Sequence, residues 1–157
     1  ELAQPTEWNH DGELAWNLLD EPAHAGVQQL VHDLNHHYRT GPALYARDTD
    51  PHSFQWLVVD DADQSGLAFA RFGLRLEDTV VGVANLTPVV RHGYRLGLPH
   101  DSRWVERLNT DSGHYGGTNV GNQGMVQAEA RPLHGQSWSA AVTLPPLAVL
   151  WLQPSTD

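Results

Sequence analysis

Apolar residues recur at helical spacing between residues 22 and 40 of this chain and at every second position from residue 43 onward. Within 22–40 they fall on one narrow stripe of a helical wheel. Asp20 and Pro22 are typical of a helix start, and Gly41-Pro42 ends the pattern. The spacing predicts one amphipathic helix, which needs a large apolar partner for the stripe formed by Val27, Leu30, Val31, Leu34 and Tyr38.

From Ala43 onward the alternation of apolar and polar residues is typical of strands. Turn clusters rich in Asp, Gly and Pro separate the runs. The run 138–144 has one apolar face, whereas 147–152 is apolar on both faces, as in a central strand. This spacing predicts an antiparallel β-sandwich of about eight strands and a domain boundary near 41–50. The runs predicted as strands are 54–60, 67–72, 80–86, 92–98, 102–109, 138–144 and 147–152.

Composition and charge restrict the possible functions. The net charge is −10, and all nine basic residues are scattered arginines. Such a chain repels phosphate backbones, so no nucleic-acid partner is expected. No apolar run approaches the roughly 20 residues of a membrane helix, so no membrane partner is expected either. The absence of Cys excludes disulfides and thiolate metal sites, and it fits a reducing compartment.

Three motifs resemble ligand sites, but each has a simpler interpretation. His32 and His36 have the spacing of two metal ligands, yet both lie opposite the apolar stripe, so a solvated face is expected. The segment 61–66 matches half of an EF-hand loop, but Phe72 replaces the bidentate Glu, which favours a hairpin turn. The glycine-rich stretch 115–124 lacks the Lys and the following helix of a P-loop, which predicts a surface loop with positive φ at several glycines.

The segment Glu7 to Asp11 (EWNHD) is the densest group of sugar-compatible side chains. An acidic pair from Glu7, Asp11 and Glu13 would suit glycoside chemistry, but spacing on an irregular segment does not define the separation of carboxylates. Trp8 is either a platform for a sugar ring or a side chain packed beneath its loop. Trp104 fits a surface or a core position. Three other tryptophans in predicted strands are expected in the core: Trp56, Trp138 and Trp151.

Several stretches of the sequence resemble those of a known protein family. EWNHD is followed by LAW at 14–16, and further stretches are GVQQLVHDLNHHYR, FQWLVVDDADQS, NLTPVVRHGY, WVERLNTDSGHYGGTNVGN and the segment 134–147. In this order, from end to end, they resemble the C-terminal end of bacterial 1,4-α-glucan (glycogen) branching enzymes of the α-amylase superfamily. The chain departs from that pattern at Pro5 and Thr6, beside EWNHD.

The resemblance implies an architecture that periodicity does not give. Residues 1–42 would be the end of a catalytic (β/α)₈ barrel, a loop plus the final helix, and residues 43–157 a C-terminal all-β domain. Loops after barrel strands line the catalytic face, so the resemblance implies that the cleft rim contacts substrate through Trp8, Asn9 and His10. The family's catalytic Asp and Glu precede this segment. No catalytic residue is therefore expected here, and the chain, which lacks Met at position 1, is expected to be a fragment.

The implied activity of the parent is a retaining transfer. An α-1,4 bond is cleaved, the glucan is held on an Asp, and the 6-hydroxyl of another glucan attacks to make an α-1,6 branch. No metal or organic cofactor is required. The implied partners are α-1,4-glucans such as glycogen and amylose, together with the catalytic barrel, and the implied location is the cytoplasm.

Two further expectations concern the isolated chain. An exposed apolar stripe on the helix predicts self-association. The alternative functions are a stand-alone α-glucan-binding β-sandwich module and the C-terminal part of another α-amylase superfamily enzyme, acting on maltose or trehalose ends. The amphipathic helix argues against the stand-alone module, because an autonomous module would not carry an unpartnered stripe.

Overall fold

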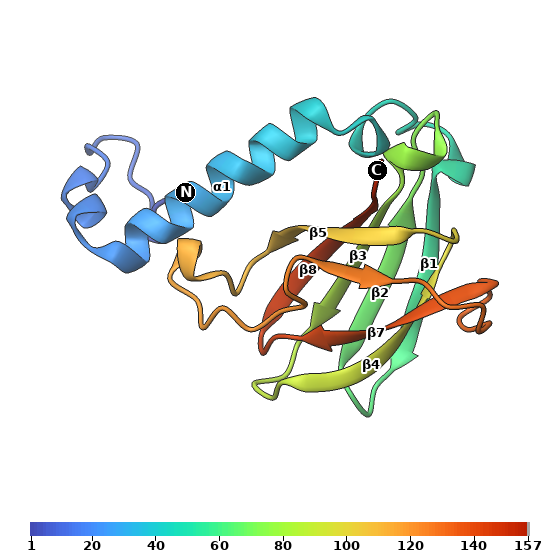
Figure 1. Ribbon diagram of the computed structural model, residues 1–157. Coiled ribbons are helices and arrows are strands. Elements are labelled where there is room, and N and C mark those ends of the chain that lie inside the picture. Colours follow the sequence, from blue (N-terminus) through green and yellow to red (C-terminus); the bar gives the residue numbers. More distant parts are fainter. Residues whose placement is uncertain (157) are drawn as a thin grey trace.

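The computed structural model describes residues 1–156, which form a helical arm and a β domain (Figure 1). Pro22 starts the long helix, where its missing N–H leaves no donor unsatisfied, and the Gly41 N–H closes the last turn on the His37 carbonyl at 2.8 Å. The predicted helix is confirmed. The helical elements are η1 (Trp16–Asp20), α1 (Pro22–Thr40), η2 (Pro42–Leu44), η3 (Pro51–Ser53), η4 (Leu76–Asp78) and η5 (Gly113–Tyr115).

The β domain is an antiparallel sandwich of two sheets, as predicted, and the described residues form eight strands. The larger sheet has the order β1-β2-β3-β8-β5-β6, and the smaller sheet pairs β4 with β7. The doubly apolar β8 lies between β3 and β5, which confirms its central position. The strands are β1 (Phe54–Asp61), β2 (Gly66–Arg71), β3 (Val80–Asn85), β4 (Arg91–Leu98), β5 (Arg103–Asn109), β6 (Met125–Gln127), β7 (Trp138–Leu144) and β8 (Ala148–Pro154).

The hydrophobic core lies between the two sheets. Trp104 of β5 is fully buried at its centre, and its indole Nε1 donates to the His100 carbonyl at 3.3 Å. The side chain therefore fills the core while its one polar atom remains bonded. The apolar face of β7 packs inward as predicted. Fully or almost fully buried neighbours include Val81, Val83, Leu96, Leu98, Ala140, Val142, Leu144, Leu150 and Leu152.

Three strand-level expectations are corrected by the structure. Trp151, expected in the core, is half-buried outside it and contacts His37 of α1. Trp56 is 53% exposed rather than in the core, because irregularities in the β1–β2 register turn both Leu57 and Val58 inward. Trp56 instead joins an outer cluster with Phe54 and Phe69, whose ring centroids lie 5.0 to 6.2 Å apart. The three-residue strand β6 was not expected, since a run this short carries little periodicity.

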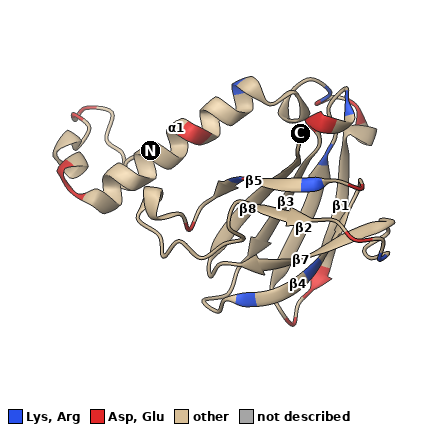
Figure 2. Cartoon of the chain, in the orientation of Figure 1, with Lys and Arg blue, Asp and Glu red and all other residues tan. Residues whose placement is uncertain are grey.

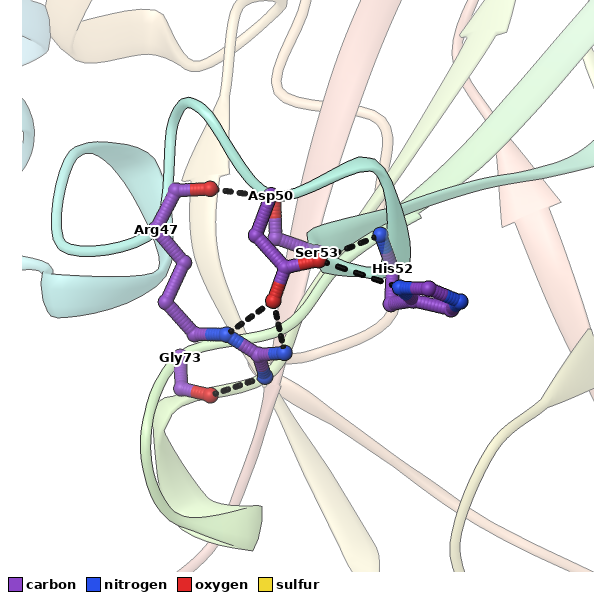
Figure 3. A network of polar contacts seen from close by, with 5 residues as sticks. All are labelled: Arg47, Asp50, His52, Ser53 and Gly73. Carbon is purple, nitrogen blue, oxygen red and sulfur yellow. Dashed lines mark hydrogen bonds and ion pairs between the residues drawn. The ribbon is translucent and has the colours of Figure 1, made fainter.

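The linker between α1 and β1 is bound to the β domain by two arginines. Arg47 donates to Asp50 through Nε at 3.1 Å and to the Gly73 carbonyl through Nη1 at 3.2 Å (Figure 3). Hydrogen bonds from Arg47 and from the His52 N–H lower the pKa of Asp50 to about 2. Similarly, Arg71 of β2 donates to the carbonyls of Ala43 and Leu44 and pairs with Asp48.

Candidate functional site

The N-terminal segment folds back on α1 and leaves an open hollow. Leu2 is buried, and its carbonyl accepts a 2.7 Å hydrogen bond from His24 Nδ1 of α1. The hollow measures about 660 Å³, within the ~300–1,000 Å³ typical of small-ligand sites. We call it the N-terminal hollow; its wall contains Leu2, Gln4, Thr6, Trp8, Trp16 and Gln28.

Trp8 lies on the wall of the N-terminal hollow and is 72% exposed. The alternative that it packs beneath its own loop is therefore wrong. Trp16, on η1, lines the same hollow and is 51% exposed. Two accessible indole rings beside the amide of Gln28 provide flat apolar surface and a hydrogen-bonding group, which suits a sugar ring.

Asn9 and His10 lie beside the hollow rather than on its wall. Asn9 shapes a turn, because its Oδ1 accepts from the Asp11 N–H at 3.0 Å and its carbonyl accepts from the Gly12 N–H at 3.2 Å. The His10 ring lies 6.1 Å from that of Trp8, tilted by 43°, and its Nε2 is 3.2 Å from Asp11 Oδ1. The structure thus brings Trp8 and His10 together, whereas Asn9 holds the turn between them.

The carboxylates considered for acid–base chemistry do not share one hollow. Glu7 lines the N-terminal hollow, whereas Asp11 is exposed and contacts the His10 ring, and Glu13 is also exposed. A retaining pair requires two carboxyl groups flanking one bond, about 5 Å apart. Glu7, Asp11 and Glu13 therefore do not form such a pair around the hollow.

Helix α1 contacts the β domain through the glycine-rich loop, a contact that sequence periodicity did not indicate. Gly26 packs on the main chain of Tyr115 in η5, and a Cβ at Gly26 would lie 2.4 Å from the Tyr115 carbonyl oxygen. The Tyr115 hydroxyl donates to Asp33 Oδ2 at 2.8 Å. In Figure 1, η5 lies beneath the first half of α1. Only glycine allows this close approach.

Charge and burial stabilise the contact between α1 and η5. Hydrogen bonds from His32, Tyr115 and Gln29 lower the pKa of Asp33, with the His32 bond the largest cause. Burial and the neighbouring Asp33 raise the pKa of Tyr115 to about 12, so its hydroxyl stays protonated as the donor. Near the other end of α1, the His37 ring stands edge-on to Trp151 of β8 at 5.9 Å, and burial lowers its pKa.

The glycine-rich loop itself is tightly bonded rather than open. Asp111 accepts from the Thr118 N–H at 3.0 Å, from the Thr118 hydroxyl at 2.6 Å and from the Val120 N–H at 3.1 Å. Burial of Asp111 favours a higher pKa, but these hydrogen bonds outweigh it and the pKa is lowered. Gly116 and Gly124 have φ of 86° and 89°, as the surface-loop interpretation predicts. The folded loop therefore fixes the position of Tyr115, through which it contacts α1.

The two remaining motifs have the simpler structures that the sequence predicts. His32 and His36 are exposed on α1, and the segment 61–66 is a hairpin turn in which Asp61 Oδ1 accepts from the Gln64 N–H at 3.3 Å. No group of three or more His, Cys, Asp or Glu in the described chain is placed to hold a metal ion. Figure 2 shows acidic and basic positions interspersed, without a continuous basic stripe. No described helix has the length and hydropathy of a membrane span.

A two-sheet antiparallel domain that follows a helical arm defines the class of this protein. Residues 56–155 match the family "Alpha amylase, C-terminal all-beta domain", and the chain belongs to that family. It is similar to 1,4-alpha-glucan branching enzyme GlgB of Burkholderia cenocepacia (strain HI2424), at 55% identity over 99% of the chain. It is also similar to GlgB 1 of Xanthomonas campestris pv. campestris (strain 8004), at 54%, and of Xanthomonas euvesicatoria pv. vesicatoria (strain 85-10), at 53%, each over 98% of the chain.

These similarities include the helical arm as well as the β domain, which confirms the family resemblance seen in the sequence. The chain spans 21% of the length of each of these relatives. The matching family is named for an all-β domain, in agreement with the two antiparallel sheets of the structure.

Proposed function

We propose that this chain is the C-terminal part of a 1,4-α-glucan branching enzyme and is not catalytic by itself. The supporting relatives are named branching enzymes, and they match the chain almost from end to end. In this proposal residues 1–42 complete the catalytic barrel, and residues 43–157 are the all-β domain that supports it. The contacts of Arg71 with the carbonyls of Ala43 and Leu44 are consistent with a boundary at this point.

The observation that carries the proposal is the orientation of α1. The side of the helix that contacts the β domain is marked by Gly26, Asp33 and His37. The apolar stripe is centred about 100° away around the helix, at ~100° per residue. Its residues are partly or largely exposed, and none is among the buried residues of the chain. A helix with one side bound and an adjacent apolar stripe open is suited to lie between two bodies, here the β domain and the barrel.

In the whole enzyme the chemistry belongs to the barrel. A glucan chain is transferred from an α-1,4 linkage, through a glucosyl-enzyme intermediate, to a 6-hydroxyl of an acceptor. The residues of this chain contribute before the transfer reaction, by binding the glucan. The N-terminal hollow, with Trp8 and Trp16 on its wall, extends the cleft rim and holds the glucan by ring stacking, while His10 packs beside Trp8.

The experiment that tests this function compares the chain with the complete enzyme. The 157-residue chain is incubated with amylose, and new α-1,6 branches are counted by debranching and chain-length analysis. We expect none from the chain and branches from the complete enzyme made from the same gene. Branch formation by the chain alone would contradict its non-catalytic role, and inactivity of the complete enzyme would contradict the branching function.

The same proposal includes partners and location. The partners are α-1,4-glucans such as glycogen and amylose, reached through the complete enzyme, and the barrel that covers α1. We propose neither a nucleic-acid nor a membrane partner for a chain of net charge −10 with dispersed arginines. A cytoplasmic location accords with the absence of Cys.

A further inference from the structure

Figure 1 shows β4 passing the turn between β1 and β2 at the end of the β domain away from α1. Residues of these segments line a second hollow. β1 is an edge strand of the larger sheet, and β4 belongs to the smaller one. The hollow measures about 660 Å³ and its wall is mostly polar. We call it the β4 hollow; its wall contains Asp61, Gln64, Arg91, His92, Tyr94 and His134.

Arg91 is the informative residue of the β4 hollow. Its side chain is half-buried and forms no hydrogen bond or ion pair among the described residues, and its Nε is buried without a partner. A partly desolvated guanidinium without an acceptor is unfavourable, and such a group calls for an explanation. The other half-buried arginines of the described chain each pair with a carboxylate: Arg47 with Asp50, Arg71 with Asp48 and Arg95 with Glu129.

His134 provides a second donor without adding charge. Its Nδ1 accepts a hydrogen bond from the Gly97 N–H at 3.2 Å, so the proton of the neutral ring is on Nε2. Burial lowers the pKa of His134 although Asp61 and Asp60 act to raise it, and the ring is neutral at pH 7. The imidazole therefore lines the hollow as an uncharged donor.

The same wall also offers acceptors. Asp61 accepts from the Tyr94 hydroxyl at 3.0 Å through Oδ2 and from the Gln64 N–H at 3.3 Å through Oδ1, and each oxygen can accept again. The side chains of Gln64 and His92 make no hydrogen bond within the described structure. Gly93, at φ 67°, lies at an irregularity of β4, and nothing lies within 4 Å of the position of a Cβ there.

The charges around the hollow favour a neutral ligand over an anion. Arg91 shares the wall of the hollow with the carboxylate of Asp61, and the second arginine of the wall, Arg95, is paired with Glu129, in a chain of net charge −10. An anion would meet the carboxylate of Asp61, whereas a hydroxyl can donate to it and accept from Arg91 at once. A mixture of unused donors and acceptors is the chemistry that binds sugar hydroxyls.

We propose that the β4 hollow is a second, non-catalytic binding site for a short segment of α-glucan, separate from the N-terminal hollow. The choice of α-glucan rests on the proposed function, whereas the preference for a neutral polyhydroxyl ligand rests on the wall itself. Because the β4 hollow lies beyond the β domain from α1, it would hold a distant part of the polymer that the enzyme modifies.

The test measures maltoheptaose binding by isothermal titration calorimetry, in the 157-residue chain with Trp8→Ala so that the N-terminal hollow contributes little. Arg91→Ala should weaken binding about ten-fold, the effect of losing hydrogen bonds to a charged group. Gln64→Ala, at a side chain without bonds in the fold, should weaken it with no change in thermal stability. Arg103→Ala is the matched control, because it removes an exposed arginine outside the hollow, and it should leave binding unchanged.

Three results would overturn the proposal. The first is equal affinity of the Arg91→Ala, Gln64→Ala and control variants. The second is Arg91-dependent binding of inorganic phosphate in place of maltoheptaose, which would identify an anion site. The third is loss of the Arg91 effect in the complete enzyme carrying Trp8→Ala, which would mean that another part of the enzyme covers the hollow. The proposed function is judged separately, by whether the complete enzyme forms branches.

Discussion

At the scale of single residues, Trp8 is the side chain of the arm most accessible for stacking. Its ring lines the N-terminal hollow, while Leu2 and His24 fix the segment to α1. Asn9 holds the turn that follows, so the ring is presented by a bonded loop rather than by a free end. This arrangement leaves little conformational entropy to lose when a flat ligand binds.

Replacing Trp8 by Ala in the complete enzyme should raise KM for amylose about five-fold and leave kcat almost unchanged. A stacking contact contributes about 1 kcal/mol, and this residue does not touch the reacting bond in the proposed function. Steady-state branching rates over a range of amylose concentrations measure both constants. Trp8→Phe, which retains an aromatic face, should restore most of the affinity, and an unchanged KM in Trp8→Ala would rule out the stacking role.

At the scale of elements, the joint between α1 and the glycine-rich loop determines how the arm is held. Asp111 folds the loop from within, and the loop then presents the main chain of Tyr115 to Gly26. The hydroxyl of Tyr115 also donates a hydrogen bond to Asp33, which lies on the side of α1 next to the apolar stripe. The strength of the joint therefore depends on space at one glycine and on one buried hydrogen bond.

Gly26→Ala should destabilise the chain by about 1–2 kcal/mol. In an open helix this change stabilises by up to about 1 kcal/mol, but here the added Cβ would meet the Tyr115 carbonyl, and overpacking costs about 1–3 kcal/mol. Urea unfolding followed by circular dichroism gives the difference. Tyr115→Phe should lower stability by about 1 kcal/mol through the lost bond, whereas Tyr45→Phe, at an exposed side chain, is the control. A more stable Gly26→Ala variant would mean that the joint does not close as described.

The apolar stripe of α1 makes a separate prediction for the isolated chain. Because Leu30, Val31 and Leu34 are only partly covered by the rest of the chain, we expect concentration-dependent self-association. Val31→Gln should shift the chain toward monomer in light scattering. The same change in the complete enzyme should lower its stability, because in the proposed function the stripe faces the barrel there. A clean monomer of the unchanged chain would contradict the expectation.

At the scale of the whole molecule, the free energy of unfolding of the chain should decrease in two steps as the pH is lowered. His37, His100 and His134 have pKa values lowered chiefly by burial, so below their ordinary value of 6.5 the unfolded chain binds more protons than the folded chain. Stability is then lost as pH falls from 6.5 toward the folded pKa values. A second loss begins below 3.8, where Asp33, Asp50, Asp78 and Asp111 have lowered pKa values.

Urea unfolding between pH 7.5 and 5 checks the first step. The free energy of unfolding should decrease on acidification, and His37→Gln should make the dependence shallower by removing one of the three contributions. His114→Gln, at an exposed position of η5, is the matched substitution with which the slope of His37→Gln is compared. A free energy that stays constant or increases between pH 7 and 5 would contradict the assigned directions.

The sequence by itself determined the local elements of this protein. The helix, seven of the strands, the inward face of β7 and the central position of β8 follow from periodicity, because side-chain direction repeats every 3.6 residues in a helix and every two in a strand. Resemblance to a family added the relation to branching enzymes and the expectation of a catalytic barrel before the β domain. Periodicity failed for Trp56, because an irregular register in β1 breaks the alternation on which it depends.

Only the tertiary structure decided which surfaces meet. The side of α1 that binds the β domain is the side marked by Gly26, Asp33 and His37, next to the apolar stripe, and the contact depends on Gly26 approaching a loop that lies far along the chain. The β4 hollow likewise gathers Gln64, Arg91 and His134 from three separate segments. Local patterns carry no information on such pairs, since contacts between distant segments arise from the packing of whole elements. The unpaired state of Arg91, on which the proposed second glucan site depends, is visible only once that packing is known.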